Sequence, residues 1–408
     1  MEKTLSALNR LLNIGGIQFC AESGREHRGL FCLQIFAVIV GFLTFICTSM
    51  FVITNAGDTI LVIQGACIWT SAVILFVSLL ICLIFRHDLR SVIVEMGFKE
   101  GMLEMPFAEY VLQNARYKKM TKLREIIISS QEVLFKWTRL FLMAYTSAAV
   151  FCALLYLLGA IYMMCVREDE SLRLLGFDMW FPWSLQNFNV YIASFIYHMY
   201  AGSLCSIAYP GLQTTIVLLI GQIIRQLRIL TFILENLTEL VSEIVPERDE
   251  RWHNYCSVIL RDVIIHYIKI KRFSNRLNVI SQPFYLTNLL SSTVLVCVCS
   301  VKIAISDKTS PDTIKYYVHG LSFSVVNFLF CYLGQQVENV GEELEKAVTK
   351  QWYVFDRRHK MNLKIFQMAL RQRMPIYIFG STKLELPTFT WFVKTGMSFF
   401  TFVMSSLE

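Results

Sequence analysis

Six apolar segments, each long enough to cross a lipid bilayer, constrain this chain more than any other feature. A helix needs about 20 apolar residues to cross a hydrocarbon core of about 30 Å. The segments that meet this length are 30–53, 62–85, 140–166, 190–223, 285–305 and 314–336. A seventh segment, 386–404, is also apolar except for a central Lys394, and it is the weakest of the seven by hydropathy. The sequence therefore predicts an all-α integral membrane protein with seven transmembrane helices.

The composition of the whole chain supports this class. Of its 408 residues, 55% are hydrophobic and 17% are charged, whereas soluble domains contain about 45–50% and about 25%. A soluble protein of this composition would expose large apolar patches, and a disordered chain would be more polar. The net charge of +7 is spread between the apolar segments. Because nucleic-acid binding needs a basic face, we expect no nucleic-acid partner.

Lysine and arginine are distributed unequally between the connecting segments. Four segments together carry 32 of these residues: 1–29, 86–139, 224–284 and 337–385. The alternate connections carry only three: 54–61, 167–189 and 306–313. Connections rich in Lys and Arg remain in the cytosol, so we predict a cytosolic N-terminus and an extracellular C-terminus. G-protein-coupled receptors have the opposite orientation, and their Asp-Arg-Tyr and Asn-Pro-x-x-Tyr motifs are absent from the corresponding helices.

Helical periodicity continues outside the apolar segments. Apolar residues recur at helical spacing in 225–245 and 254–280, and 338–350 is a charged helix after the sixth segment. The long fourth segment is expected to kink near Pro210. These patterns predict cytosolic helices continuous with the membrane helices. The chain divides into a cytosolic N-terminal segment 1–29, four membrane helices with an outer ligand cavity 30–223, cytosolic helices 224–284, two membrane helices 285–336, cytosolic assembly helices 337–385 and a pore-lining helix 386–408.

The sequence contains no catalytic or metal-binding motif. It has no phosphate-binding glycine loop, no HExxH and no CxxC. We therefore expect no enzymatic activity, no metal and no cofactor. Ionisable residues inside membrane helices are candidates for function, and two histidines, His198 and His319, lie in the predicted spans. The alternative for both is a hydrogen bond to a neighbouring helix, and for His319 this alternative is favoured.

Aromatic residues gather in the outer halves of the predicted membrane helices. Tyr and Trp at the headgroup level form an interfacial belt, but several aromatic residues lie deeper. In the fourth helix Tyr191, Phe195 and His198 share one face at i, i+4 and i+7. An apolar cavity with aromatic walls and few polar groups suits a small, neutral aromatic or heteroaromatic ligand. The predicted ligand-binding residues are Gln64, Trp69, Phe151, Tyr156, Tyr191, Phe195, His198 and Met199.

A polar stripe follows one face of the last apolar segment. Thr395, Ser398, Phe402 and Ser405 lie at i, i+3, i+7 and i+10, and Ser406 extends the stripe. In lipid such a stripe faces either another helix or water. The commoner explanation is contact between helices. The other explanation is a pore, in which a ring of such helices lines a water path narrowed by Phe402.

The C-terminal third carries a series of motifs that resembles the insect odorant receptor family. The motifs are Cys331-Tyr-Leu-Gly334, the acidic stretch 342–345, Trp352-Tyr353, Gln367-Met368-Ala369, Arg371-Gln372-Arg373-x-Pro375, Leu386-Pro387-x-Phe389 and 396–401. Trp180-Phe-Pro182-Trp183 resembles the family's extracellular loop before the fourth helix. The rest of the chain is similar in length, span layout and orientation.

This resemblance implies a specific activity. It implies a ligand-tuning subunit of an odorant-gated, non-selective cation channel in the plasma membrane of a sensory neuron. A small neutral volatile would open a central pore in a heterotetramer with the co-receptor, and 337–385 would hold the subunits together. Phe402 and Ser406 fall where the co-receptor has its narrow gate. The alternatives are a gustatory-type homotetrameric channel, or a seven-helix receptor or transporter.

Overall fold

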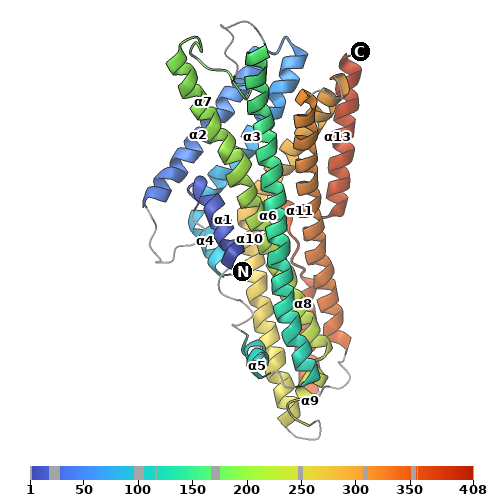
Figure 1. Cartoon of the computed structure of the whole chain (residues 1–408). Coiled ribbons are helices and arrows are strands. Elements are labelled where there is room, and N and C mark those ends of the chain that lie inside the picture. The colour runs from blue at the N-terminus through green and yellow to red at the C-terminus, as the bar shows by residue number, and fades with distance from the viewer. Residues whose placement is uncertain are drawn as a thin grey trace.

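Three helices of this chain are much longer than a bilayer is thick. They are α6 (Lys118–Val166), α10 (Arg251–Ile305) and α11 (Pro311–Lys350), with 49, 55 and 40 residues. At 1.5 Å per residue their lengths are about 74, about 83 and about 60 Å, against a hydrocarbon core of about 30 Å. The computed structural model describes residues 2–17, 28–95, 105–114, 117–166, 175–246, 251–306, 311–350, 355 and 357–407. Figure 1 shows the long helices running side by side to its lower end. The predicted continuity of helices beyond the apolar segments is confirmed.

In the described part of the chain, six helical stretches are long and apolar enough to cross a membrane. They are α2 (Arg28–Thr54), α3 (Thr59–Ile84), most of α6, the run from α7 (Phe188–Ser203) to α8 (Tyr209–Glu235), α10 and most of α11. The seventh predicted segment forms α13 (Leu386–Leu407), a 22-residue helix that lies against α10 and α11. Its length of about 33 Å also matches a membrane core. The predicted all-α architecture is therefore confirmed.

Large apolar side chains cover the outside of the bundle. On α2 the exposed residues are Phe36, Ile39, Phe42, Leu43 and Ile46, and on α6 they are Leu140, Met143, Leu154, Leu158 and Ile161. Soluble monomers rarely expose continuous apolar surface of this extent. This surface suits contact with lipid chains.

Helix α8 forms the centre of the bundle. Every residue from Tyr209 to Leu227 is buried, and α6, α10 and α11 pack around it. The apolar residues predicted at helical spacing in 225–245 are also buried, through the end of α8 and into α9 (Leu237–Ser242). These apolar stripes therefore pack within the subunit.

The fourth apolar run changes its helical hydrogen bonding close to the predicted kink. A π-helical turn, η2 (Leu204–Ala208), joins α7 to α8, and Pro210 stands in the first turn of α8. Proline has no backbone N–H to donate, and π-turns occur mostly as single turns inside α-helices, frequently at functional sites. The irregularity thus lies directly before Pro210 and next to the cavity described below.

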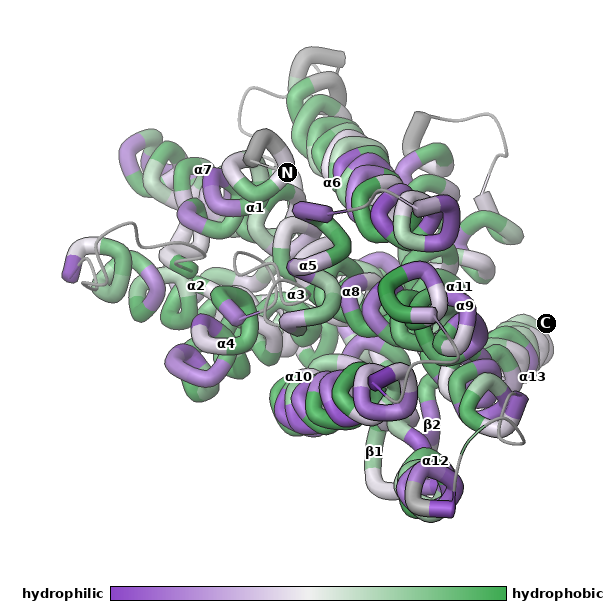
Figure 2. Tube along the Cα trace, turned by 90° about the horizontal axis from the view of Figure 1, so that it is seen from below, coloured by the Kyte–Doolittle hydropathy of each residue, from purple (hydrophilic) through white to green (hydrophobic). Residues whose placement is uncertain are grey.

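Four shorter helices complete the list of helices in the described part of the chain. They are α1 (Glu2–Ile14), α4 (Arg86–Ile93), α5 (Pro106–Asn114) and α12 (Arg357–Arg371). Hydrophilic residues are visible on α4, α10 and α12 when the bundle is seen from below in Figure 2. The acidic helix after the sixth segment is the lower part of α11. Trp352 and Tyr353 lie outside the described residues.

A two-stranded hairpin, which the sequence analysis did not predict, precedes α13. It pairs β1 (Tyr377–Phe379) with β2 (Thr382–Lys383) in antiparallel order. Gly380 makes the turn with φ of 55°, a left-handed conformation that glycine adopts without steric cost. The Asn278 amide of α10 donates to the Pro375 carbonyl at 2.9 Å, which fixes the hairpin to the bundle.

The chain then passes close to α11 at Gly334. A Cβ atom at this position would lie 1.9 Å from the carbonyl oxygen of Leu384, so only glycine fits. One turn further along α11, the Glu338 carboxylate accepts from Lys383 at 2.8 Å and lies 3.3 Å from Arg373. Steric contact and ion pairing therefore fasten the segment before α13 to α11.

Candidate functional site

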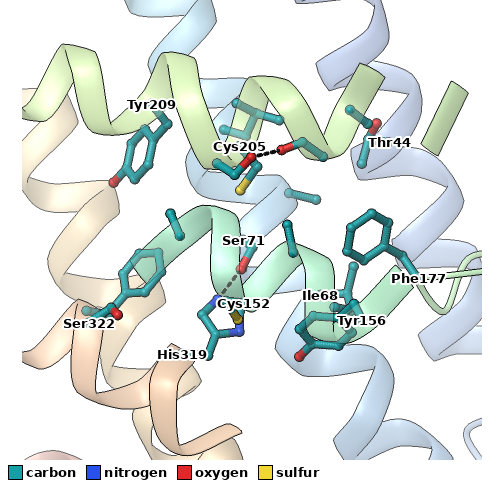
Figure 3. A pocket seen from close by; sticks show the side chains of 18 of the residues that line it. Thr44, Ile68, Ser71, Cys152, Tyr156, Phe177, Cys205, Tyr209, His319 and Ser322 are labelled. Carbon is teal, nitrogen blue, oxygen red and sulfur yellow. Dashed lines mark hydrogen bonds between the residues drawn. The ribbon is translucent and has the colours of Figure 1, made fainter. Parts of the chain in front are cut away.

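A cavity of about 100 Å³ lies between the helices of the bundle. Its wall is formed by α2, α3, α6, the α7–α8 run, α11 and the segment before α7, as Figure 3 shows. The lining residues are Thr44, Ile68, Ser71, Ala72, Leu75, Tyr145, Ala149, Cys152, Ala153, Tyr156, Phe177, Met179, Ala201, Gly202, Cys205, Ser206, Tyr209, His319, Ser322 and Phe323. None of these described residues carries a formal charge at neutral pH. Such a cavity suits a neutral, mainly apolar molecule.

Small residues create the empty space. Ala149 and Ala153 lie one turn apart on α6, and Ala201 and Cys205 lie one turn apart opposite them. Residues at i and i+4 share one helix face, so two helices present small side chains toward the same point.

The segment before α7 closes the cavity on one side. Its Phe177 and Met179 line the wall, and the Trp180 backbone N–H donates to the Cys47 carbonyl of α2 at 3.1 Å. The Phe177 ring lies 5.6 Å from the ring of Tyr156 and 5.5 Å from the ring of His198. The Trp180–Trp183 motif therefore anchors a loop that contributes to the cavity wall.

Two polar side chains meet across the cavity wall. Ser71 Oγ of α3 lies 3.0 Å from His319 Nε2 of α11, a pair labelled in Figure 3. The Nδ1 atom of His319 and the hydroxyl of Tyr156 are buried and have no hydrogen-bond partner in the described part of the chain. The hydrogen bond predicted as the alternative for His319, to a neighbouring helix, is confirmed.

A buried polar network lies beside the cavity. The hydroxyl of Tyr209, which lines the cavity, donates to Asn288 Oδ1 at 2.8 Å. The Asn288 amide donates to Asn327 Oδ1 at 2.9 Å, and the Asn327 amide donates to Ser292 Oγ at 2.7 Å. These bonds connect α8, α10 and α11. Because buried polar groups are stable only when paired, the network fixes the relative position of the three helices.

The structure places only one of the predicted ligand-binding residues in the cavity wall. Tyr156 lines the cavity, and His198 is buried behind the wall against Phe177 and Phe181. The indole N–H of Trp69 donates to Ser49 on α2 at 2.9 Å. The others lie outside the wall: Gln64, Tyr191 and Phe195 are half-buried, and Phe151 and Met199 are exposed. Ligand contact by these residues stays a prediction.

Sequence reasoning missed most of the lining for a physical reason. The residues predicted from the sequence were mainly large aromatic ones, whereas a cavity forms where side chains are small. On α7 the predicted face ended at Met199, and the lining of this run begins at Ala201. The available signal was the recurrence of small residues at helical spacing on two apolar segments.

The predicted pore stripe lies on the open face of α13. Ser398, Phe402 and Ser405 are exposed, with Phe402 at 69%, and Thr395 is half-buried. The opposite face packs inward, where Phe400, Val403 and Met404 contact Ile63, Cys297 and Val301. The side chain of Ser406 lies outside the described residues. Most of the described stripe therefore faces away from the core of its own subunit, and its role in a pore stays a prediction.

The fold and the composition define a class: a helical membrane protein with several spans and an uncharged cavity between its helices. Residues 102–397 match the model of the family described as 7tm Odorant receptor. This match covers more than half of the chain, and the protein belongs to the 7tm odorant receptor family. It is thus a receptor-family protein rather than a member of an enzyme family.

Similar proteins agree with this family. The putative odorant receptor 69a, isoform A, of Drosophila melanogaster is 23% identical over 232 residues. That alignment covers 56% of this chain and 55% of the relative, so the chain spans about half the length of the curated relative it matches.

Solved structures extend the likeness over the whole chain. The insect olfactory receptor OR5 from Machilis hrabei in complex with eugenol matches with a TM-score of 0.82, covering 99% of this chain and 98% of that one. A second structure of OR5 matches with a TM-score of 0.80, covering 98% and 97%. Both are 13% identical to this chain, so they show that the two proteins share a fold.

Proposed function

We propose that this chain is the ligand-tuning subunit of an odorant-gated cation channel. The uncharged cavity between α3, α6, α8 and α11 supports this proposal. The N-terminus lies in the cytosol of a sensory neuron and the C-terminus outside its plasma membrane, as the excess of Lys and Arg in alternate connections favours.

The cavity restricts the chemistry of the ligand. A charged ligand would lose its hydration without gaining an opposite charge, because no charged side chain lines the wall in the described structure. A volume of about 100 Å³ is somewhat smaller than the roughly 150 Å³ apolar cavity that binds benzene in another protein. The ligand is therefore a neutral compound with about one ring.

The open face of α13 supports the channel part of the proposal. Exposed hydroxyls at Ser398 and Ser405 flank the exposed ring of Phe402, and a ring of such helices forms a water path with an apolar constriction. The partners are co-receptor subunits, which complete a tetramer through the lower helices of 337–385. The ligand opens the pore to the extent that it binds the open state more tightly than the closed state.

The test is agonist-evoked current in cells that express this chain with a co-receptor. Ala153→Leu fills the cavity, whereas Ala144→Leu adds the same side chain to the exposed side of the same helix. We expect Ala153→Leu to abolish or strongly right-shift the response to a panel of neutral single-ring compounds, with eugenol included. Ala144→Leu should respond like the unmodified chain, and both variants should reach the surface.

Three results separate this proposal from others. Current that persists without the co-receptor indicates a homotetrameric channel. A second-messenger response without direct current contradicts the channel. Equal responses from Ala153→Leu, Ala144→Leu and the unmodified chain mean that the ligand does not bind in this cavity.

A further inference from the structure

We propose that Ser71 and His319 form a polar anchor that selects ligands by a single hydrogen-bonding group, and that this anchor accepts both donors and acceptors. The inference rests on the proposed function, because it requires the ligand to bind in the cavity. It adds the chemical class: neutral single-ring compounds that carry one hydroxyl, carbonyl or ether group.

The two polar residues lie next to each other in the cavity wall. Ser71 and His319 come from α3 and α11, both line the cavity, and Ser71 Oγ is 3.0 Å from His319 Nε2. The second ring nitrogen of His319 is buried without a hydrogen-bond partner in the described residues. The Tyr156 ring stands edge-on to this imidazole at 6.4 Å and 84°, and its hydroxyl is equally unpaired there. An unpaired polar group in an apolar wall is costly, and a ligand that pairs with it recovers that cost.

A neutral imidazole can either donate or accept a hydrogen bond at its free ring nitrogen. One ring nitrogen donates and the other accepts, so the partner of Nε2 determines what Nδ1 offers. When the Ser71 hydroxyl donates to Nε2, Nδ1 carries the proton and donates to a carbonyl or ether oxygen of the ligand.

The opposite arrangement is also available. Ser71 Oγ lies 3.3 Å from the Cys67 carbonyl one turn back on α3. When the hydroxyl donates there, Nε2 carries the proton and donates to Ser71 Oγ, and Nδ1 accepts from a ligand hydroxyl. Rotation of the Ser71 hydroxyl, together with the exchange of the imidazole proton from Nδ1 to Nε2 through the other tautomer, therefore converts the anchor from a donor to an acceptor.

Three other hydroxyls in the wall already donate to protein groups. Ser322 donates to Val318 at 2.7 Å, and Ser206 donates to Gly202 at 2.7 Å. The Tyr209 hydroxyl donates to Asn288. These groups gain little from a polar ligand. Ser324 of α11 lies outside the cavity wall and donates to the Gly320 carbonyl at 2.9 Å, so Ser324→Ala is a matched control for removal of the anchor.

The experiment compares ligand pairs of the same shape. Benzaldehyde and styrene differ in an acceptor, and phenol and toluene differ in a hydroxyl. We expect the unmodified chain, expressed with the co-receptor, to prefer the polar member of both pairs. His319→Leu should reduce both preferences by about 3- to 10-fold, the range of one neutral hydrogen bond, mainly through lower potency of the polar members. His319→Gln, which keeps a donor and an acceptor, should restore part of the preference, and Ser324→Ala should leave it unchanged.

The outcomes distinguish a hydrogen-bonding role of His319 from ligand binding in the cavity as such. Equal losses of potency for polar and apolar members in His319→Leu show that the residue only shapes the site, which overturns the anchor and leaves the proposed function intact. A preference for only one of the two pairs overturns the dual donor and acceptor role. Responses that survive both His319→Leu and Ala153→Leu contradict the proposed function itself, as does a chain that responds to none of the four compounds. If His319→Leu does not reach the surface, Ser71→Ala, which removes one oxygen atom, replaces it with the same expected direction.

Discussion

Replacement of Gly334 by alanine tests the contact between α11 and the segment that leads into α13. The added Cβ would lie 1.9 Å from the Leu384 carbonyl oxygen, whereas a normal contact of these atoms is about 3.3 Å. The backbone before α13 must therefore move by about 1 Å or more. Because overpacking typically costs about 1–3 kcal/mol and can cost more, we expect Gly334→Ala to lower stability by at least that range.

The same helix provides a matched control. Gly341 lies two turns further along α11, and a Cβ there would meet no atom within 4 Å. Since alanine is better than glycine inside a helix by up to about 1 kcal/mol, Gly341→Ala should raise stability. Thermal unfolding of the detergent-solubilised protein should thus show melting-temperature changes of opposite sign. Equal changes for the two variants, or a stabilised Gly334→Ala, would refute the close approach of α11 and Leu384.

Two further predictions concern polar contacts. Asn288→Leu removes hydrogen bonds to Tyr209, Gln213 and Asn327. At about 0.6 kcal/mol per bond in a membrane bundle, thermal unfolding should show a loss of stability of roughly 2 kcal/mol. Ser300→Ala removes a hydrogen bond within one helix and should cost little in the same measurement. Glu338 raises the pKa of Lys383 above 10.5, so their pair stabilises the fold below that pH and loses this effect as the pH rises through the raised pKa. Lys383→Gln should therefore reduce melting temperature modestly at neutral pH and hardly at high salt or high pH.

Much of the fold could be predicted because hydropathy and the helical spacing of apolar residues are local properties of the sequence. Segments such as 62–85 are apolar throughout, and a helix is the structure that satisfies their backbone in lipid. Spacing also separated two faces of α13, with Phe400 and Phe402 on different sides of one helix, but it left open which face contacts other helices. The hairpin was missed because β1 and β2 have only three and two residues, too few for a periodic signal.

The cavity could not be located from the sequence because it depends on how helices rotate against each other. Trp69 and Ser71 are two residues apart on α3, yet Trp69 bonds to α2 and Ser71 faces the cavity. Likewise Cys152 lines the cavity, whereas its neighbour Phe151 is exposed. Only the packing of α3 and α6 against their neighbours decides which face meets empty space.

The most direct test of a ligand-gated pore is the reactivity of cysteines introduced into α13. Cysteines at Ser398, Phe402 and Ser405 are placed on the exposed face, and cysteines at Phe400 and Val403 on the packed face. A small charged thiol reagent is applied outside cells that also express the co-receptor, with the unmodified chain as the control for native cysteines. We expect block of current only for the exposed face, and faster block while agonist is present. Block that is equal on both faces, or uniform silence along the stripe, would contradict a pore lined by this helix.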